Sequence, residues 1–171
     1  MRRTVVIGAL LAAFAVPAAA LAASRAVGDG TLVVKNGTAP KGTPVVTLVI
    51  RGAAIGQISG YGRVVIDDPT PNDGSSPEVT GANWHRDSSD TATTYGGTDF
   101  RFRVVGGVYK ITIYGSGVDL VASGRGTATL SGSADTPTRD GVYSVNGGDF
   151  HSLPTAPTKQ LTIGVPTSST G

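Results

Sequence analysis

Hydrophobic and polar residues alternate in short runs along most of this chain, and Gly, Asn or Pro interrupts the runs about every 6 to 12 residues. A strand places successive side chains on opposite faces, so alternation with a period of two predicts half-buried β-strands. The spacing of three and four residues that marks an amphipathic helix does not occur in the sequence. The pattern therefore predicts an all-β protein, with strands over residues 31–35, 45–51, 55–58, 63–67, 98–105, 108–114, 118–122, 127–131, 141–145, 148–152 and 160–165.

The pair Gly106-Gly107 predicts a hairpin turn between two of these strands. Both glycines tolerate a positive φ, as a two-residue hairpin turn requires. In the register that this turn imposes, Phe102 faces Ile111 on the apolar side of the hairpin. We therefore expect one face of this hairpin to be aromatic and aliphatic and the other face to be polar.

An internal echo indicates two copies of one unit. Residues 46–55 match residues 109–118 position by position in apolar character, and Gly52 matches Gly115. Residues 62–66 match residues 126–130 in the same way, allowing for a one-residue gap. We expect an antiparallel β-sandwich built from two quasi-repeated four-strand units. A β-barrel or a short β-solenoid is the alternative.

The N-terminus has the pattern of a secretory signal peptide. Arg2 and Arg3 precede an apolar run of about a dozen residues, and small residues precede a cleavage site after Ala22. The run is shorter than the roughly 20 residues that span a bilayer. We expect a Sec-type signal peptide over residues 1–22, a single all-β domain over 23–165 and a flexible C-terminal tail over 166–171. The mature chain would be secreted or held at the cell surface, with no membrane span.

Loss of the leader also changes the charge. The full chain has 14 Lys and Arg against 12 Asp and Glu, and removal of Arg2 and Arg3 leaves 12 of each. A chain of zero net charge has no overall cationic field, which argues against nucleic acid as a partner. The chain has no cysteine, so the domain must be stable without disulfides.

Four short segments spread over the mature chain carry a family resemblance. They are residues 30–37 (GTLVVKNG), 51–56 (RGAAIG), 100–103 (FRFR) and 143–148 (YSVNGG). Together they resemble small exported glycine-rich β proteins of high-GC Gram-positive bacteria, a group without an assigned function. The resemblance implies an exported β protein and carries over no catalytic residue.

The longest stretch without a predicted strand, residues 68–97, holds the only tryptophan of the chain. Loops of this length in a compact domain are usually functional or disordered. Trp84 offers a stacking platform, Arg86 an anion contact, and His85 and Asp87 polar groups, which makes these four residues a candidate ligand surface. In the alternative interpretation, Trp84 covers the open edge of the sandwich and its neighbours are simply solvated.

A second candidate surface is cationic. On the predicted hairpin, Arg101, Arg103 and Lys110 lie on the face opposite to Phe102, where they form a stripe. Such a stripe can contact anionic envelope polymers, but charged residues also serve to keep a sheet face soluble.

The acidic turn at Asp67, Asp68, Asn72 and Asp73 is a weak calcium candidate, because hard cations bind several oxygens supplied by one loop. Its spacing does not match an EF-hand, and Asp and Asn beside Pro and Gly are ordinary turn formers. We expect no other metal and no cofactor.

Motifs for catalysis are missing from the sequence. It has neither the Gly-x-Ser-x-Gly nor the Ser-x-x-Lys pattern, and Glu78 is its only glutamate. The first hypothesis is a non-enzymatic, exported interaction module that binds a carbohydrate or another cell-envelope polymer. The alternative is a small secreted hydrolase or metal-dependent enzyme that uses the 84–90 loop, and clustering of Asp87, Asp90 and His151 with His85 would favour it. A structural protein without a specific ligand is the third hypothesis.

Overall fold

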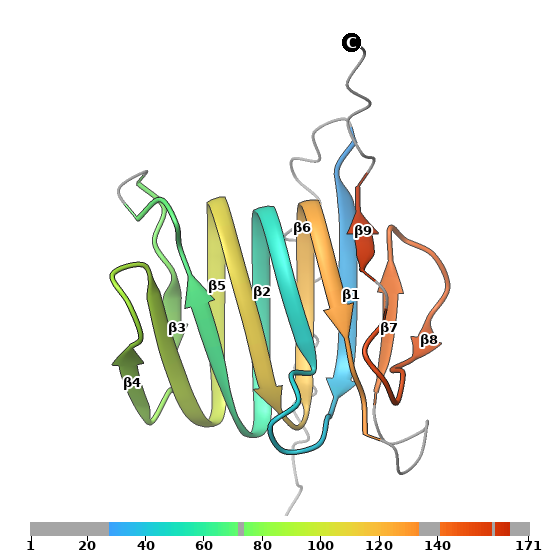
Figure 1. The fold of residues 1–171 in the computed structure, drawn as a ribbon, viewed down its shortest axis with the longest axis horizontal. Helices are drawn as coiled ribbons and strands as arrows, with labels where there is room; N and C mark the ends of the chain where they lie inside the picture. Colours follow the sequence, from blue (N-terminus) through green and yellow to red (C-terminus); the bar gives the residue numbers. More distant parts are fainter. Residues whose placement is uncertain (1–27, 72–73, 134–140, 159, 165–171) are drawn as a thin grey trace, which may run out of the picture.

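The computed structural model describes residues 28–71, 74–133, 141–158 and 160–164, and these residues form one antiparallel sheet (Figure 1). Hydrogen-bonded neighbours follow the order β3-β5-β2-β6-β1-β7-β8, with β4 paired to β5 and β9 paired to β6. The predicted all-β class is confirmed. The nine strands are β1 (Gly30–Gly37), β2 (Val46–Asp67), β3 (Glu78–Thr80), β4 (Trp84–Asp87), β5 (Ala92–Gly115), β6 (Val118–Leu130), β7 (Val142–Val145), β8 (His151–Ser152) and β9 (Leu161–Ile163).

The predicted signal peptide, residues 1–22, and the predicted tail, residues 166–171, lie outside the described residues. Within the described ranges, no helix is long and apolar enough to cross a membrane.

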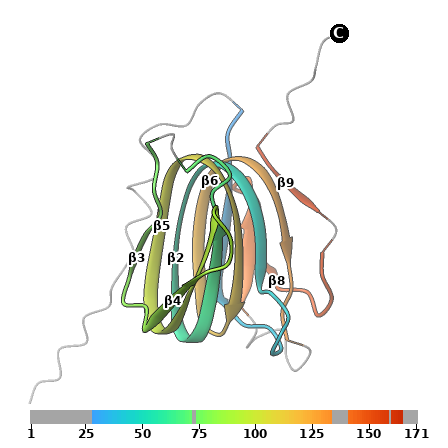
Figure 2. The same cartoon turned by 60° about the vertical axis from the view of Figure 1, so that its left-hand side comes forward.

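Long strands give the sheet two layers, because each of them bends and continues from one layer into the other (Figure 2). In the first layer, residues 46–51 of β2 pair with residues 108–113 of β5. In the second layer, residues 53–58 of β2 pair with residues 100–105 of β5. Strand β6 bends in the same way, since its residues 126–130 and 118–123 pair with these two parts of β2. The layers are therefore two sides of one bent sheet, and the described sheet remains open between β3 or β4 at one end and β8 at the other.

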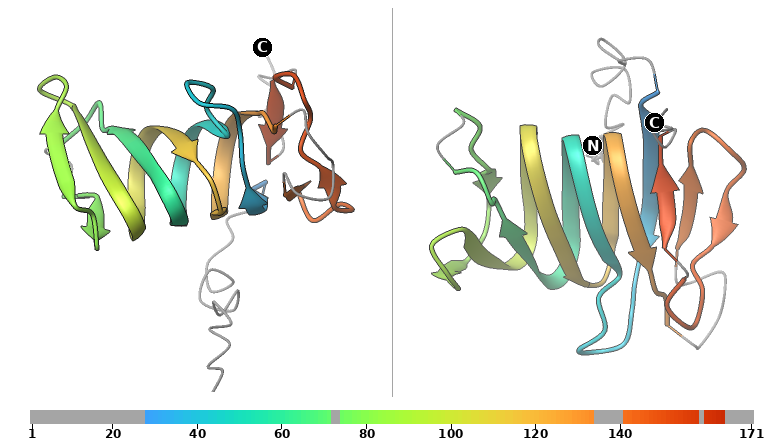
Figure 3. Two further views of the ribbon diagram at one scale, coloured as in Figure 1. Left: turned by 90° about the horizontal axis from the view of Figure 1, so that it is seen from below. Right: turned by 45° about the horizontal axis from the view of Figure 1, so that its top comes forward.

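The pair formed by β2 and β5 is also coiled upon itself (Figure 3). Residues 62–67 of β2 lie between two parts of β5, because Val64 pairs with both Tyr95 and Ile113. In the first layer, residues 46–51 of β2 are therefore followed by residues 108–113 of β5, by residues 62–67 of β2, by the start of β5 and finally by β4. This winding brings residues that are distant in the sequence into one row on the outer face.

The prediction of a hairpin turn at Gly106-Gly107 is wrong. Strand β5 runs through both glycines, and β2 pairs with β5 on either side of them, Ala54 with Val104 and Ile50 with Tyr109. The two glycines have φ of 78° and 57° and form an irregular corner in a continuous strand. Phe102 and Ile111 therefore lie in different layers of the sheet instead of facing each other across a hairpin.

The sequence echo marks equivalent bends, although its two copies do not form separate units. Gly52 and Gly115, which match in the echo, both adopt a positive φ, at 149° and 137°. The predicted strands 45–51, 55–58 and 63–67 merge into β2. Strands from the two predicted units alternate in the sheet, in the order β5-β2-β6-β1.

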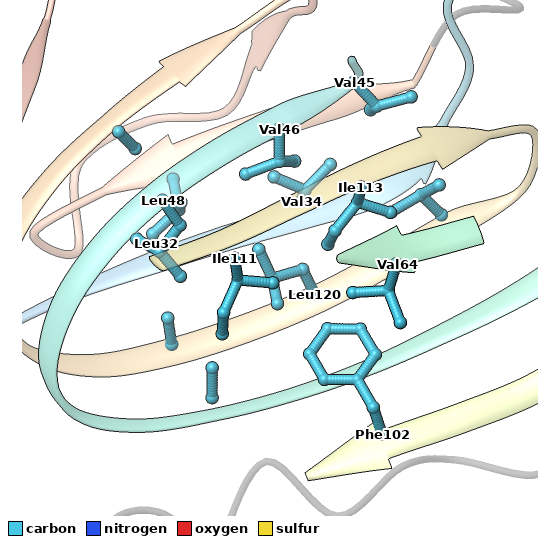
Figure 4. Close-up of a cluster of buried hydrophobic side chains, with 14 of the residues drawn as sticks. Leu32, Val34, Val45, Val46, Leu48, Val64, Phe102, Ile111, Ile113 and Leu120 are labelled. Atoms are coloured by element: carbon cyan, nitrogen blue, oxygen red, sulfur yellow. The ribbon is translucent and has the colours of Figure 1, made fainter. Parts of the chain in front are cut away.

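The apolar core fills the space between the two layers (Figure 4). Inward-facing positions of the long strands are almost completely buried, as the alternation predicts. The two strands that flank β2 in the second layer contribute Phe102 and Leu120 to this core, and the first layer contributes Leu48 and Ile111. The outward positions of the same strands remain free to carry a functional surface.

Candidate functional site

The stretch of residues 68–97 is not the long loop that the sequence indicates. It contains β3, β4 and the beginning of β5. Strand β4 is Trp84–Asp87, and it pairs with residues 93–96 of β5. A strand of four mostly charged or aromatic residues shows no apolar alternation, because it lies at the edge of the sheet with all four residues exposed.

Pairing places the four candidate residues of β4 on two different faces. Trp84 is opposite Gly96, and His85 is opposite Tyr95, which packs against the core. Because successive side chains alternate, Trp84 and Arg86 lie on the outer face, whereas His85 and Asp87 lie on the other side of the strand. The sequence prediction grouped these four residues into one surface, and the structure separates them into two pairs.

The inner pair makes local contacts within the edge of the sheet. The His85 and Tyr95 ring centroids are 6.1 Å apart, with the rings tilted by 34°. The hydroxyl of Thr93 donates a hydrogen bond of 2.9 Å to Asp87 Oδ1. These contacts hold β4 against β5.

Trp84 lies directly on the backbone of Gly96. A methyl group added at Gly96 would overlap the indole carbons Cζ2 and Cε2. The tryptophan therefore leans across β5 towards β2, and the residue is still 42% exposed. Gly96 also pairs with Arg63 of β2 on its other side, so the indole leans towards an arginine.

Arg63 and Tyr114 extend this arrangement, and sequence reasoning missed both. Arg63 pairs with Gly96 on one side and with Tyr114 on the other. The Arg63 guanidinium carbon lies 3.9 Å from the centroid of the Tyr114 ring, in a cation–π contact. We call the residues Trp84, Gly96, Arg63 and Tyr114 the Trp84 row. Tyr61, which is 71% exposed, precedes Arg63 by two positions and borders the row.

The predicted cationic stripe does not form. Arg101 and Arg103 pair with residues of β3 in the second layer, whereas Lys110 pairs with Val49 and Asp67 in the first layer. The bend at Gly106-Gly107 separates them. Arg103 also forms an ion pair of 3.3 Å with Glu78. The grouping failed because it depended on the hairpin register.

Two carboxylate oxygens of the calcium candidate accept hydrogen bonds from the protein. Asp67 Oδ1 accepts a hydrogen bond of 2.8 Å from the Thr91 hydroxyl, and Asp68 is buried with Oδ1 accepting from the backbone N–H of Thr70. Asn72 and Asp73 lie outside the described residues. Among the described residues, no group of three or more His, Asp or Glu side chains is arranged to hold a metal ion.

The two histidines lie far apart in the sheet. His85 is on β4, which pairs with β5 at one end, whereas His151 is on β8 at the other end (Figure 1). Asp90 is exposed in the connection between β4 and β5. These residues are therefore not brought together into one site.

The Trp84 row is thus the best-formed candidate site, a line on the outer face in which Trp84 and Arg63 are exposed and Tyr114 is half-buried. Such a line can stack on a ring and bind an anion. No protein-family model matches the chain, and comparisons with curated proteins and with solved structures gave no significant match.

Proposed function

We propose that the protein is an exported, non-enzymatic interaction module that binds a carbohydrate or another cell-envelope polymer through the Trp84 row. The observation that carries the proposal is the placement of a half-exposed tryptophan and an arginine–tyrosine stack in one outward row. Exposed aromatic rings present a flat apolar face with polar surroundings, which suits the flat faces of sugar rings. Strands that are paired on both sides hold Arg63 and Tyr114, so the surface is preorganised for binding.

Two further observations support a module over the alternative enzyme. Clustering of His151 with His85 would favour the enzyme, but the two histidines are at opposite ends of the sheet. Asp87 accepts a hydrogen bond from Thr93 and lies on the side of β4 away from Trp84. The leader pattern of residues 1–22 supports export, as does the resemblance to small exported β proteins.

The test is retention of the purified protein on isolated cell-envelope fractions, with Trp84→Ala alongside. Phe150→Ala is the matched control, because Phe150 is also an exposed aromatic and also contacts a cation, Lys35. We expect Trp84→Ala to abolish retention and Phe150→Ala to leave it unchanged. Equal retention of all three proteins, or of none, would overturn the proposal.

A further inference from the structure

We infer that the Trp84 row binds acidic polysaccharide, that is, a polymer whose sugar rings carry a carboxylate. The inference rests on the proposed function, since it names the ligand class of the same surface. It depends on how Arg63 is held, on what surrounds its charge and on its distance from Trp84.

Arg63 is oriented by its neighbour and keeps its hydrogen-bonding edges. Its guanidinium lies over the Tyr114 ring, which engages the flat face of the group. The N–H donors point outward in the plane of the guanidinium, so stacking leaves them available for a carboxylate, which they can bind in a bidentate manner. Within the described part of the chain, no carboxylate forms an ion pair with Arg63.

The charge of Arg63 is also uncompensated by its neighbours in the sheet. Its cross-strand partners are Gly96 and Tyr114, neither of which is charged. Lys110 lies on the same outer face, but it is directly opposite Asp67. An anionic ligand therefore gains more from Arg63 than from Lys110.

Trp84 supplies the second part of the site. Its strand is two strands from that of Arg63, which corresponds to about 10 Å between backbones, and the indole leans over Gly96 to shorten this distance. An apolar ring face next to a guanidinium matches a sugar ring with an attached carboxylate. Arg86, also on the outer side of β4, adds a second cation beside Trp84.

Single-stranded nucleic acid offers the same pair of groups, a ring and an anion, but it is the less suitable ligand. Its binding depends on neutralising several phosphates with a basic groove. The chain without residues 1–22 has equal numbers of basic and acidic residues. One stacked arginine beside a tryptophan fits a carboxylated sugar better than a polyphosphate chain.

The experiment is isothermal titration of the purified protein with polygalacturonate and with its methyl ester, which has the same backbone but no free carboxylates. We expect the methyl ester to bind about tenfold more weakly, and Arg63→Gln to weaken polygalacturonate binding by a similar factor. Arg63→Lys keeps the charge but loses the planar fork, so its affinity for polygalacturonate should lie between that of the unchanged protein and that of Arg63→Gln. Lys110→Gln, the matched control on the same face, should change the affinity less than twofold.

The outcomes separate this inference from the proposed function. Equal binding of the two polymers, equal effects of Arg63→Gln and Lys110→Gln, or absence of polygalacturonate binding would each overturn the acidic ligand class. Tighter binding of single-stranded oligothymidylate would replace it with nucleic acid. In each case the proposed function would still stand if envelope retention required Trp84. Melting curves and circular dichroism of each variant would show that the fold is kept.

Discussion

Gly52 of β2 and Gly124 of β6 lie directly opposite each other, and both adopt a positive φ, at 149° and 141°. Each glycine is at the point where its strand passes from one layer of the sheet to the other. A Cβ atom at Gly52 would collide with the carbonyl oxygen of Ser123, and one at Gly124 with that of Arg51. At the bend, the backbones of β2 and β6 therefore approach each other more closely than residues with a Cβ atom would allow.

We expect Gly52→Ala to destabilise the fold by more than the strain of its φ alone. A positive φ of this kind costs a non-glycine residue about 1–3 kcal/mol, and the overlap with Ser123 adds to that cost. Urea unfolding followed by circular dichroism would measure the difference in the free energy of unfolding.

Gly147→Ala is the control for this substitution. Gly147 also has a positive φ, at 75°, but an added Cβ there would meet open space. We expect Gly147→Ala to lower the free energy of unfolding only by the strain of its positive φ. If the two variants were equally stable, close backbone approach at the bend would not contribute to the fold.

The long strands could be predicted from the sequence, whereas the bends between them and the short edge strands β3 and β4 could not. Alternation correctly assigned Phe102 and Ile111 to the buried face, because burial on one face imposes a period of two. A pair such as Gly106-Gly107 has positive φ both in a hairpin turn and in a corner of a continuous strand, so residue type does not distinguish the two. The choice depends on pairing with β2, which is distant in the sequence.

The site shows the same limit. Trp84 could be singled out because it is the only tryptophan and follows no apolar pattern. Arg63 and Tyr114 could not be joined to it, because the three meet only where β2 inserts between two parts of β5. Once the register is known, the cross-strand partners of Arg63 on the outer face identify the row.

Tyr109→Phe is expected to keep or increase stability. Tyr109 is completely buried, and its hydroxyl has no hydrogen-bond partner among the described residues. A buried polar group without a partner costs about 1–3 kcal/mol, and phenylalanine removes that group while it keeps the ring. Urea unfolding would measure the gain, with the exposed Tyr61→Phe as a neutral control. A loss above about 1 kcal/mol would indicate that the hydroxyl is hydrogen-bonded in solution.

Glu78→Gln should have little effect on stability. The ion pair between Glu78 and Arg103 joins side chains that are 67% and 52% exposed. Exposed pairs of this kind contribute about 0–1 kcal/mol, and salt screens them. Thermal melting at low and high salt would check this, and a large salt-dependent loss would show that the pair fixes the short strand β3 to the sheet.

Gly96→Ala tests whether the position of Trp84 depends on the bare backbone beneath it. The added methyl group overlaps the indole, so Trp84 must move away from the strand and towards solvent. Because Trp84 is the only tryptophan, its fluorescence emission should shift to longer wavelength and report this displacement directly. The substitution should also lower the melting temperature, because the indole loses its contact with β5.

In a Trp84→Ala background the same change meets no ring, so Gly96→Ala should then cost much less stability. The difference between the two costs measures the coupling of the two residues. Equal costs in both backgrounds, with unchanged emission of the single variant, would mean that the indole does not rest on Gly96 in solution.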